Sequence, residues 1–233
     1  MLGTSQLSGF GSRAAGGGPA TATYIDETDI LTGATNYTFS GHAIGAAAAD
    51  RRVVVGVHLV GGATQGVSSV TVGGQCCAEI VEKVLSVGSG ANEQTVGLYE
   101  VALAAGTTAD IVVNGARSSN GCYIGVWNVN GASGASVFNA SDDAAPSAAD
   151  PTILMDCNAN GCVITFSGNA GGSGSTHTWS NVTERFDLVA EVNTAKSGAD
   201  ADFGATQSSL DCSAAWSDAL SGGVTIGASW SPS

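Results

Sequence analysis

The stretch RRVVVGVHLVGGATQGVSSVTVGG, residues 51–74, places one strand-like run before a group of glycines and another after it. Val53 to Val60 is rich in β-branched residues, which favour strands. A phosphate-binding loop needs a helix directly after its glycines, so that the helix amides point at the anion. Here the glycines lead into GVSSVTVGG, without GxGxxG spacing or a Walker lysine. We therefore expect these glycines to turn a hairpin between two strands.

Comparable strand-like runs recur along the rest of the chain, separated by Gly, Asn, Asp and Ser at intervals of about 8 to 15 residues. Alternation is clear in CYIGVWNVN, residues 122–130. This spacing predicts an all-β fold, an antiparallel β-sandwich or jelly roll over residues 23–233. We expect one short helix at residues 43–52 and a loop at residues 139–151. The side chains expected in the core are Val53, Val55, Val57, Val70, Val72, Ile124, Val126, Ile164 and Phe166.

The charge balance limits the partners of the chain. Seven basic residues stand against twenty acidic ones, giving a formal net charge of −13. Such a surface repels nucleic acid and anionic lipid, so we expect no nucleic-acid partner and no membrane partner. No apolar run reaches transmembrane length, and the N-terminus lacks the features of a signal peptide. These features predict folding in a cytoplasm.

Six cysteines are present without a CxxC pair. Cytosolic thiols normally stay reduced, so one interpretation is that all six are small buried side chains. The other concerns Cys157 and Cys162, which flank the sequence NANG. If NANG turns a hairpin, the two thiols face each other at a distance that a disulfide spans.

Residues 1–22 form a separate arm of Gly, Ser, Ala and Thr. This arm has too few apolar residues to build a core, so we expect it to be disordered in the isolated protein. Its candidate assembly anchors are Leu2, Leu7, Phe10 and Arg13. We predict that the arm becomes ordered against another subunit through main-chain pairing. A merely solvated tail is the alternative.

The sequence contains no recognisable catalytic or metal-binding motif. His42, His58 and His177 are isolated from one another, and His177 lies in a segment with loop composition. The acidic groups fit solvated loops, while calcium binding and paired carboxylates for glycoside hydrolysis stay open as alternatives. Trp179, Trp216 and Trp230 lie near turns or the C-terminus, where indoles could stack on sugars. We therefore expect no catalytic residues, no cofactor and no metal.

The chain also resembles a known class of proteins. The segments TFSGHAIGAAAADRRVVVGVHLVGG, SSVTVGGQ, VGLYEVALAAGTTADIVVN and YIGVWNVNGASG are similar to structural proteins of tailed bacteriophages and alphaproteobacterial prophages. HTWSNVTERFDLVAEV and GVTIGASWSPS extend the resemblance over roughly residues 35–233. Because the shared motifs are strands and glycine turns, the resemblance implies a fold and a role in a particle but no reaction.

The resemblance implies a non-enzymatic virion structural protein, a decoration or fibre protein on the capsid or neck, or a tail fibre-adaptor. Such a protein is made in the host cytoplasm, is exposed on the particle surface and contacts other capsid, neck or tail subunits. A homo-oligomer, with a trimer favoured, is expected. The alternatives are a carbohydrate-binding module that contacts host glycans and a hydrolase of surface polysaccharide.

Overall fold

The computed structural model describes residues 18–62, 66–86, 93–133, 137–146, 150–170, 175–190, 194–217 and 222–233. Strands account for 72% of these residues, the sheets are antiparallel, and the described part of the chain has no helix. The expected all-β class is therefore confirmed. None of the described elements is a helix that could cross a membrane.

Two five-stranded sheets form the middle of the molecule, and we call them inner sheet 1 and inner sheet 2. In spatial order, inner sheet 1 contains β1 (Thr21–Ile30), β9 (Gly121–Asn130), β3 (Arg52–Val60), β7 (Gln94–Ala102) and β6 (Ala78–Leu85). Inner sheet 2 contains β10 (Asn139–Ala145), β18 (Gly222–Trp230), β12 (Gly161–Ala170), β15 (Thr194–Phe203) and β14 (Thr183–Ala190).

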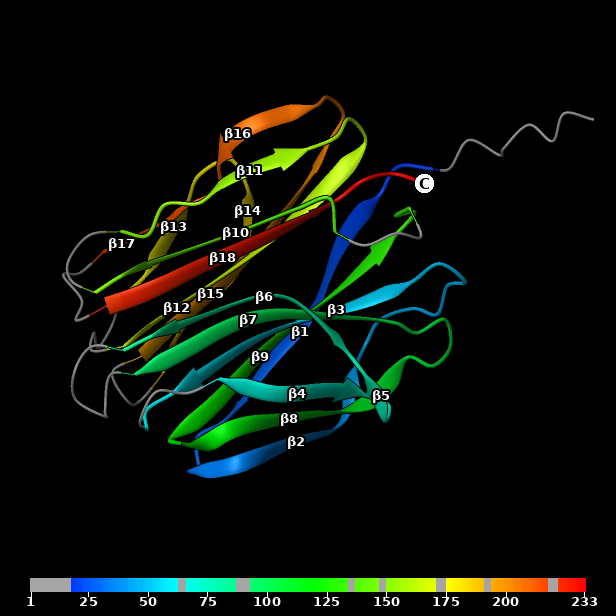
Figure 1. Cartoon of the computed structure of the whole chain (residues 1–233). Helices are drawn as coiled ribbons and strands as arrows, with labels where there is room; N and C mark the ends of the chain where they lie inside the picture. Colours follow the sequence, from blue (N-terminus) through cyan, green and yellow to red (C-terminus); the bar gives the residue numbers. More distant parts are fainter. Residues whose placement is uncertain are drawn as a thin grey trace, which may run out of the picture.

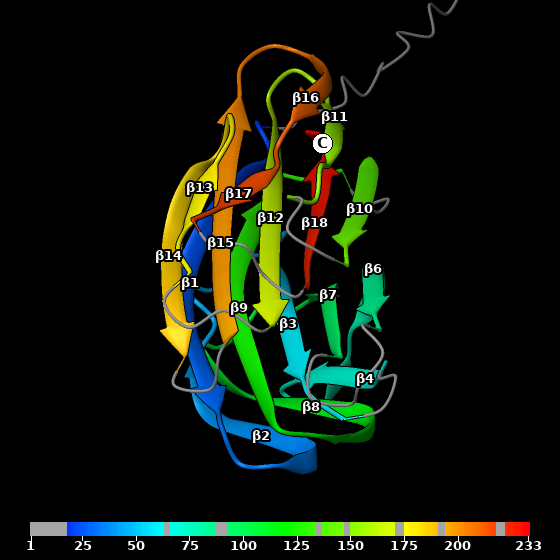
Figure 2. The same ribbon diagram turned by 90° about the vertical axis from the view of Figure 1, so that its left-hand side faces the viewer.

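Smaller sheets cover the two inner sheets on their far sides. The outer sheet contains, in spatial order, β2 (Ala34–Ala43), β8 (Thr108–Ser119), β4 (Val67–Val72) and β5 (Gln75–Cys76). Two outer ribbons consist of β11 (Leu154–Cys157) with β16 (Gln207–Asp211), and of β13 (His177–Trp179) with β17 (Ala214–Trp216). Figure 1 shows β2, β8 and β4 below inner sheet 1, and β11 with β16 at the top. Figure 2 shows β13 and β17 in front of β14 and β15.

Three apolar clusters hold these layers together. The cluster between the two inner sheets includes Val54, Trp127 and Phe166. A second cluster joins inner sheet 1 to the outer sheet, and a smaller third one joins inner sheet 2 to β11 and β16. All nine side chains expected in the core are buried. Seven of them belong to the second cluster, whereas Ile164 and Phe166, which lie on β12 of inner sheet 2, belong to the cluster between the inner sheets.

The expected helix at residues 43–52 is wrong, and Arg51 explains why. Arg51 is 1% exposed. It donates hydrogen bonds of 2.6–3.2 Å to six backbone carbonyls, those of Ile44, Gly45, Ala46, Leu103, Ala105 and Gly106. The carbonyls of residues 44–46 therefore point at one side chain instead of accepting the i+4 amides of a helix.

Two other expectations about connections also need correction. The glycines after β3 do not turn a hairpin, because β3 pairs with β7 and β9 while β4 pairs with β5 and β8 in a different layer. A strand does follow the glycines, as expected. The segment 139–151 was expected to be a loop, but Asn139–Ala145 forms edge strand β10.

The N-terminal boundary lies close to the expected one. β1 begins at Thr21, so the last two residues of the expected arm belong to a strand. Leu2, Leu7, Phe10 and Arg13 lie outside the described residues.

Candidate functional site

The most concentrated group of polar side chains lies between inner sheet 2 and the β13–β17 ribbon, around His177. His177 Nδ1 lies 2.7 Å from Asp187 Oδ1, and the backbone amide of His177 donates to Asp187 Oδ2 at 2.9 Å. The imidazole side chain is fully buried. Two hydrogen bonds to one carboxylate fix the ring, so that in the neutral imidazole Nδ1 carries the hydrogen and Nε2 is an acceptor.

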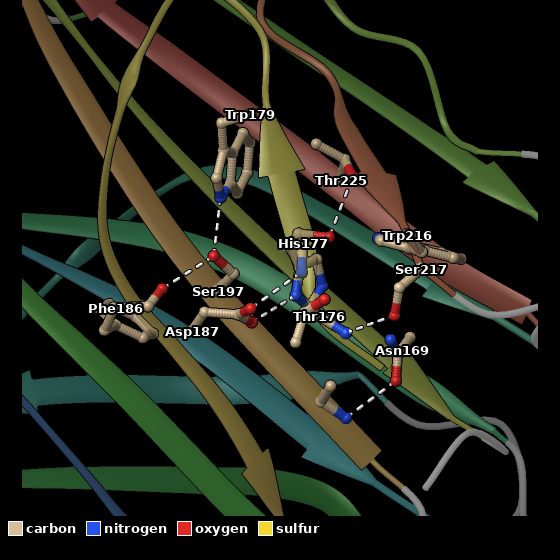
Figure 3. Close-up of polar contacts among 12 residues, drawn as sticks. Asn169, Thr176, His177, Trp179, Phe186, Asp187, Ser197, Trp216, Ser217 and Thr225 are labelled. Atoms are coloured by element: carbon tan, nitrogen blue, oxygen red, sulfur yellow. Dashed lines mark hydrogen bonds and ion pairs between the residues drawn. The ribbon is translucent and has the colours of Figure 1, made fainter. Parts of the chain in front are cut away.

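Two indoles form the walls of this group, as Figure 3 shows. Trp216 meets His177 edge-on, with 6.1 Å between ring centroids. The Trp216 ring also covers Gly223, where an added Cβ would lie 1.2 Å from a ring carbon, so that only glycine fits there. On the other side, Trp179 Nε1 donates to Ser197 Oγ at 2.7 Å. Both indoles lie on the short strands of one ribbon.

Four buried polar atoms in this group have no hydrogen-bond partner: Asn169 Nδ2, Ser175 Oγ, His177 Nε2 and Trp216 Nε1. Asn169 Oδ1 accepts from the Ala195 amide at 2.8 Å, which fixes the orientation of the side-chain amide. Three of these residues are neighbours, because Asn169 pairs with Gly223, Trp216 covers Gly223, and Trp216 pairs with His177. Ser175 precedes His177 by two residues. Buried polar atoms in native proteins nearly always have a partner, so this group is suited to bind water or a small polar molecule.

The expectation that His177 lies in a loop is wrong, because His177 is on β13 and has a carboxylate partner. A serine catalytic triad would also need a hydroxyl within hydrogen-bond reach of Nε2. No serine in the described part of the chain occupies that position. Asp187, Asn169 and Ser175 were not anticipated from sequence, because they lie on different strands or between strands, and only the packing of the β13–β17 ribbon on inner sheet 2 brings them to His177.

His58 lies in a separate polar group between the two inner sheets. The ring stacks on Tyr123 at 5.6 Å, and Nε2 lies 3.1 Å from Gln94 Oε1. Complete burial lowers the His58 pKa to about 3. His42, by contrast, lies 3.9 Å from Asp26, and burial lowers its pKa as well. The structure therefore places the three histidines in three different environments.

The acidic groups serve as structural partners. Asp29 pairs with Lys196 at 2.9 Å and Asp142 pairs with Lys83 at 2.6 Å. Asp202 accepts the Ala22 amide at 2.9 Å. Within the described ranges, no group of three or more His, Cys, Asp or Glu side chains could hold a metal ion.

The candidate disulfide between Cys157 and Cys162 is absent from the structure, in which both are free thiols. The strand β11 pairs with β16, and β12 pairs with β15 and β18, so NANG does not turn a hairpin. Cys162 therefore belongs to the cluster between the inner sheets, whereas Cys157 belongs to the cluster under β11 and β16. The alternative, buried thiols, fits four of the six cysteines, whereas Cys76 is exposed and Cys77 half-buried.

The three tryptophans expected near turns also differ from one another. Trp230 is 1% exposed and belongs to the cluster between the inner sheets. Trp179 and Trp216 are half-buried in the group around His177.

No protein-family model, curated protein or solved structure matches the chain. The similarity to bacteriophage structural proteins therefore stays a prediction from sequence.

Proposed function

We propose that this protein is a non-enzymatic structural component of a bacteriophage virion, a decoration or fibre protein that assembles through its N-terminal arm. The observation that carries the proposal is the order of the strands. β1, β9, β3 and β7 are neighbours in one sheet, and β2, β8, β4 and β5 are neighbours in the sheet that covers it. Along the chain, β1 to β4 alternate between the two sheets, β5 stays with β4, and β7 to β9 alternate again, an order that we interpret as a jelly roll. Jelly rolls are frequent in viral capsid proteins and lectins.

The position of the chain ends supports attachment at one end of the molecule. The Ser233 amide donates to the Gly131 carbonyl at 2.9 Å, and the backbone of Gly131 lies against Pro19. The first described residues and the last ones are therefore neighbours, and Figure 1 places the C-terminus at this end. A pocket of about 280 Å³ lies beside them, lined by Pro19, Ala20, Thr21, Asn160, Gly161, Asp202, Phe203 and Gly204. An arm that starts here leaves the fold where a recess is available to a partner.

Deletion of residues 1–17 tests the proposed attachment while leaving β1 complete. The truncated protein should keep its β-rich circular dichroism spectrum and melting temperature but should no longer incorporate into particles. Immunogold labelling of intact particles gives the position on head, neck or tail. Incorporation of the truncated protein at the normal level would refute attachment through the arm.

A second candidate function is binding of host glycans, and the group around His177 favours it. Sugars are commonly bound by an aromatic side chain together with several hydrogen-bonding groups. The half-buried indole of Trp216 offers the aromatic surface, and a movement of the β13–β17 ribbon would bring its buried Nε1 and the buried Nε2 of His177 within reach of a sugar. A glycan array with the full chain and with Trp216→Phe tests this function. Binding that Trp216→Phe abolishes would support it, whereas no binding by the folded wild-type chain would count against it.

A further inference from the structure

The two inner sheets have the same strand order. In spatial order, the strands of the two sheets correspond one to one: β1 to β10, β9 to β18, β3 to β12, β7 to β15 and β6 to β14. The outer layers correspond in the same way. β2 and β4 both pair with β8, whereas β11 pairs with β16 and β13 pairs with β17, so that β16 and β17 together take the place of β8. The first half of the chain, residues 18–133, and the second half, residues 137–233, therefore share one topology.

The contacts between the halves are reciprocal. Trp127 on β9 donates from Nε1 to Asp200 on β15 at 3.1 Å. Trp230 on the equivalent strand β18 donates from Nε1 to Glu100 on the equivalent strand β7, at 3.0 Å. Each indole thus reaches a carboxylate of the other half. Each carboxylate is also bound by an arginine of its own half, Arg185 or Arg52.

A second reciprocal fit occurs where equivalent strands β3 and β12 face each other. The Phe166 ring on β12 lies over Gly56 on β3, where an added Cβ would come within 3.0 Å of the ring. The His58 ring on β3 lies over Gly168 on β12, where an added Cβ would come within 2.7 Å. Each half therefore supplies one ring and one glycine to the same contact.

From these observations we infer that the chain consists of two copies of one folding unit, and that the halves pack on each other as the subunits of a twofold dimer do. In such an interface each contact between two elements occurs twice, as the contact of β9 with β15 and that of β18 with β7 do here. The strands are equivalent but the bonded carboxylates are not, because the registers place Asp202 rather than Asp200 at the position of Glu100. The apolar cluster between the inner sheets is thus a subunit-type interface within one chain. This inference does not depend on the proposed virion role.

The experiment is to cut the connection between the halves in the folded full-length protein. A protease recognition sequence placed at residues 134–136 allows cleavage after folding. The two fragments should co-elute as one folded species and should recombine after separation in urea. Fragments that elute apart, or that lose their β-rich spectrum once cut, would overturn the inference.

Matched substitutions test whether the interface is reciprocal. Trp127→Phe and Trp230→Phe each remove one indole N–H bonded to a carboxylate, so each should weaken the association of the cut fragments roughly 10- to 100-fold. Tyr37→Phe is the control, because its hydroxyl bonds to Ser119 within the first half. The control should leave the fragment affinity unchanged. Loss of affinity in only one of the two tryptophan variants would contradict the reciprocal interface.

Discussion

The ammonium of Lys196 lies 3.4 Å from the centroid of the Tyr123 ring, and it donates to Asp29 at 2.9 Å. The lysine side chain is 2% exposed and that of Asp29 is 37% exposed. Burial is also the main reason why the pKa of Lys196 is lowered. A buried cation is thus stabilised by one ring and one carboxylate at the edge of the two inner sheets.

The unequal burial of this pair predicts unequal effects of removing either partner. Asp29→Asn leaves the ammonium without its carboxylate, and we expect a loss of about 2 kcal/mol in the free energy of unfolding. Lys196→Met should cost less than about 1 kcal/mol, because methionine fills similar space and leaves Asp29 in contact with water. Urea denaturation at pH 7 measures both values. A larger loss for Lys196→Met would show that burial does not control the energy of this pair.

Stability should also fall in mild acid because of His58. Its pKa is about 3 in the folded protein, against an ordinary value of 6.5. The unfolded chain therefore binds a proton that the folded chain does not. The stabilisation is complete above about pH 6.5 and is lost as the pH falls towards 3, with a slope approaching about 1.4 kcal/mol per pH unit.

His58→Phe, which keeps a ring over Gly168, should remove this contribution. Its free energy of unfolding between pH 5 and 6.5 should depend less on pH than that of the wild type. Most carboxylates stay ionised in this range, so the difference between the two proteins isolates the histidine. Parallel curves for wild type and variant would exclude His58 as the source.

Arg51 should be essential for the conformation of the segment that follows β2. Arg51→Lys keeps the charge but replaces the planar fork by a single ammonium, which cannot reach all six carbonyls. Because each buried carbonyl left without a donor costs about 1 kcal/mol or more, we expect a loss of at least about 3 kcal/mol. Arg117→Lys, at an exposed position, is the control and should change stability by less than about 0.5 kcal/mol. Equal melting temperatures for the two variants would contradict this role.

The cysteines should react with a thiol reagent at rates that depend on their position in the layers. Burial raises the pKa of Cys157 to about 11 and that of Cys77 to about 12. In the folded protein, a thiol reagent should therefore modify Cys76 first, and Cys76→Ser should remove the fast phase. Peptide mapping without reduction should find Cys157 and Cys162 as free thiols. A peptide that links them would require β11 and β12 to pair differently.

Sequence patterns predicted the strands whose side chains alternate or are β-branched. β3, residues 52–60, was anticipated with its bounds because valine dominates it. Most of β15 was missed because its residues 194–200, TAKSGAD, are small or charged, although the structure buries all of them. Small residues suit this strand, since it packs between β14, β12 and the indoles of Trp127 and Trp179. Because other strands create this environment, the sequence of β15 carries no periodic pattern from which the strand could be predicted.

Local sequence patterns also could not predict which distant strands pair with each other. The NANG turn looks like a hairpin because its flanking residues favour strands, yet its two strands enter different layers. The candidate site depends on the same kind of information. His177 on β13 and Asp187 on β14 are only ten residues apart in sequence, but their strands belong to different sheets. Packing of the β13–β17 ribbon on inner sheet 2 brings the carboxylate to the imidazole.

The apolar interface between the halves has a consequence for biosynthesis. The first half ends at residue 133, and β18, the strand that supplies Val224, Ile226 and Trp230 to its exposed face, begins only at Gly222. At about 5 to 20 residues per second, a ribosome needs roughly 5 to 20 seconds to make residues 134–230, up to the end of β18. During this time Val54, Leu98 and Trp127 have no covering sheet. Nascent chains that stop before β18 would therefore be substrates for chaperones or would aggregate.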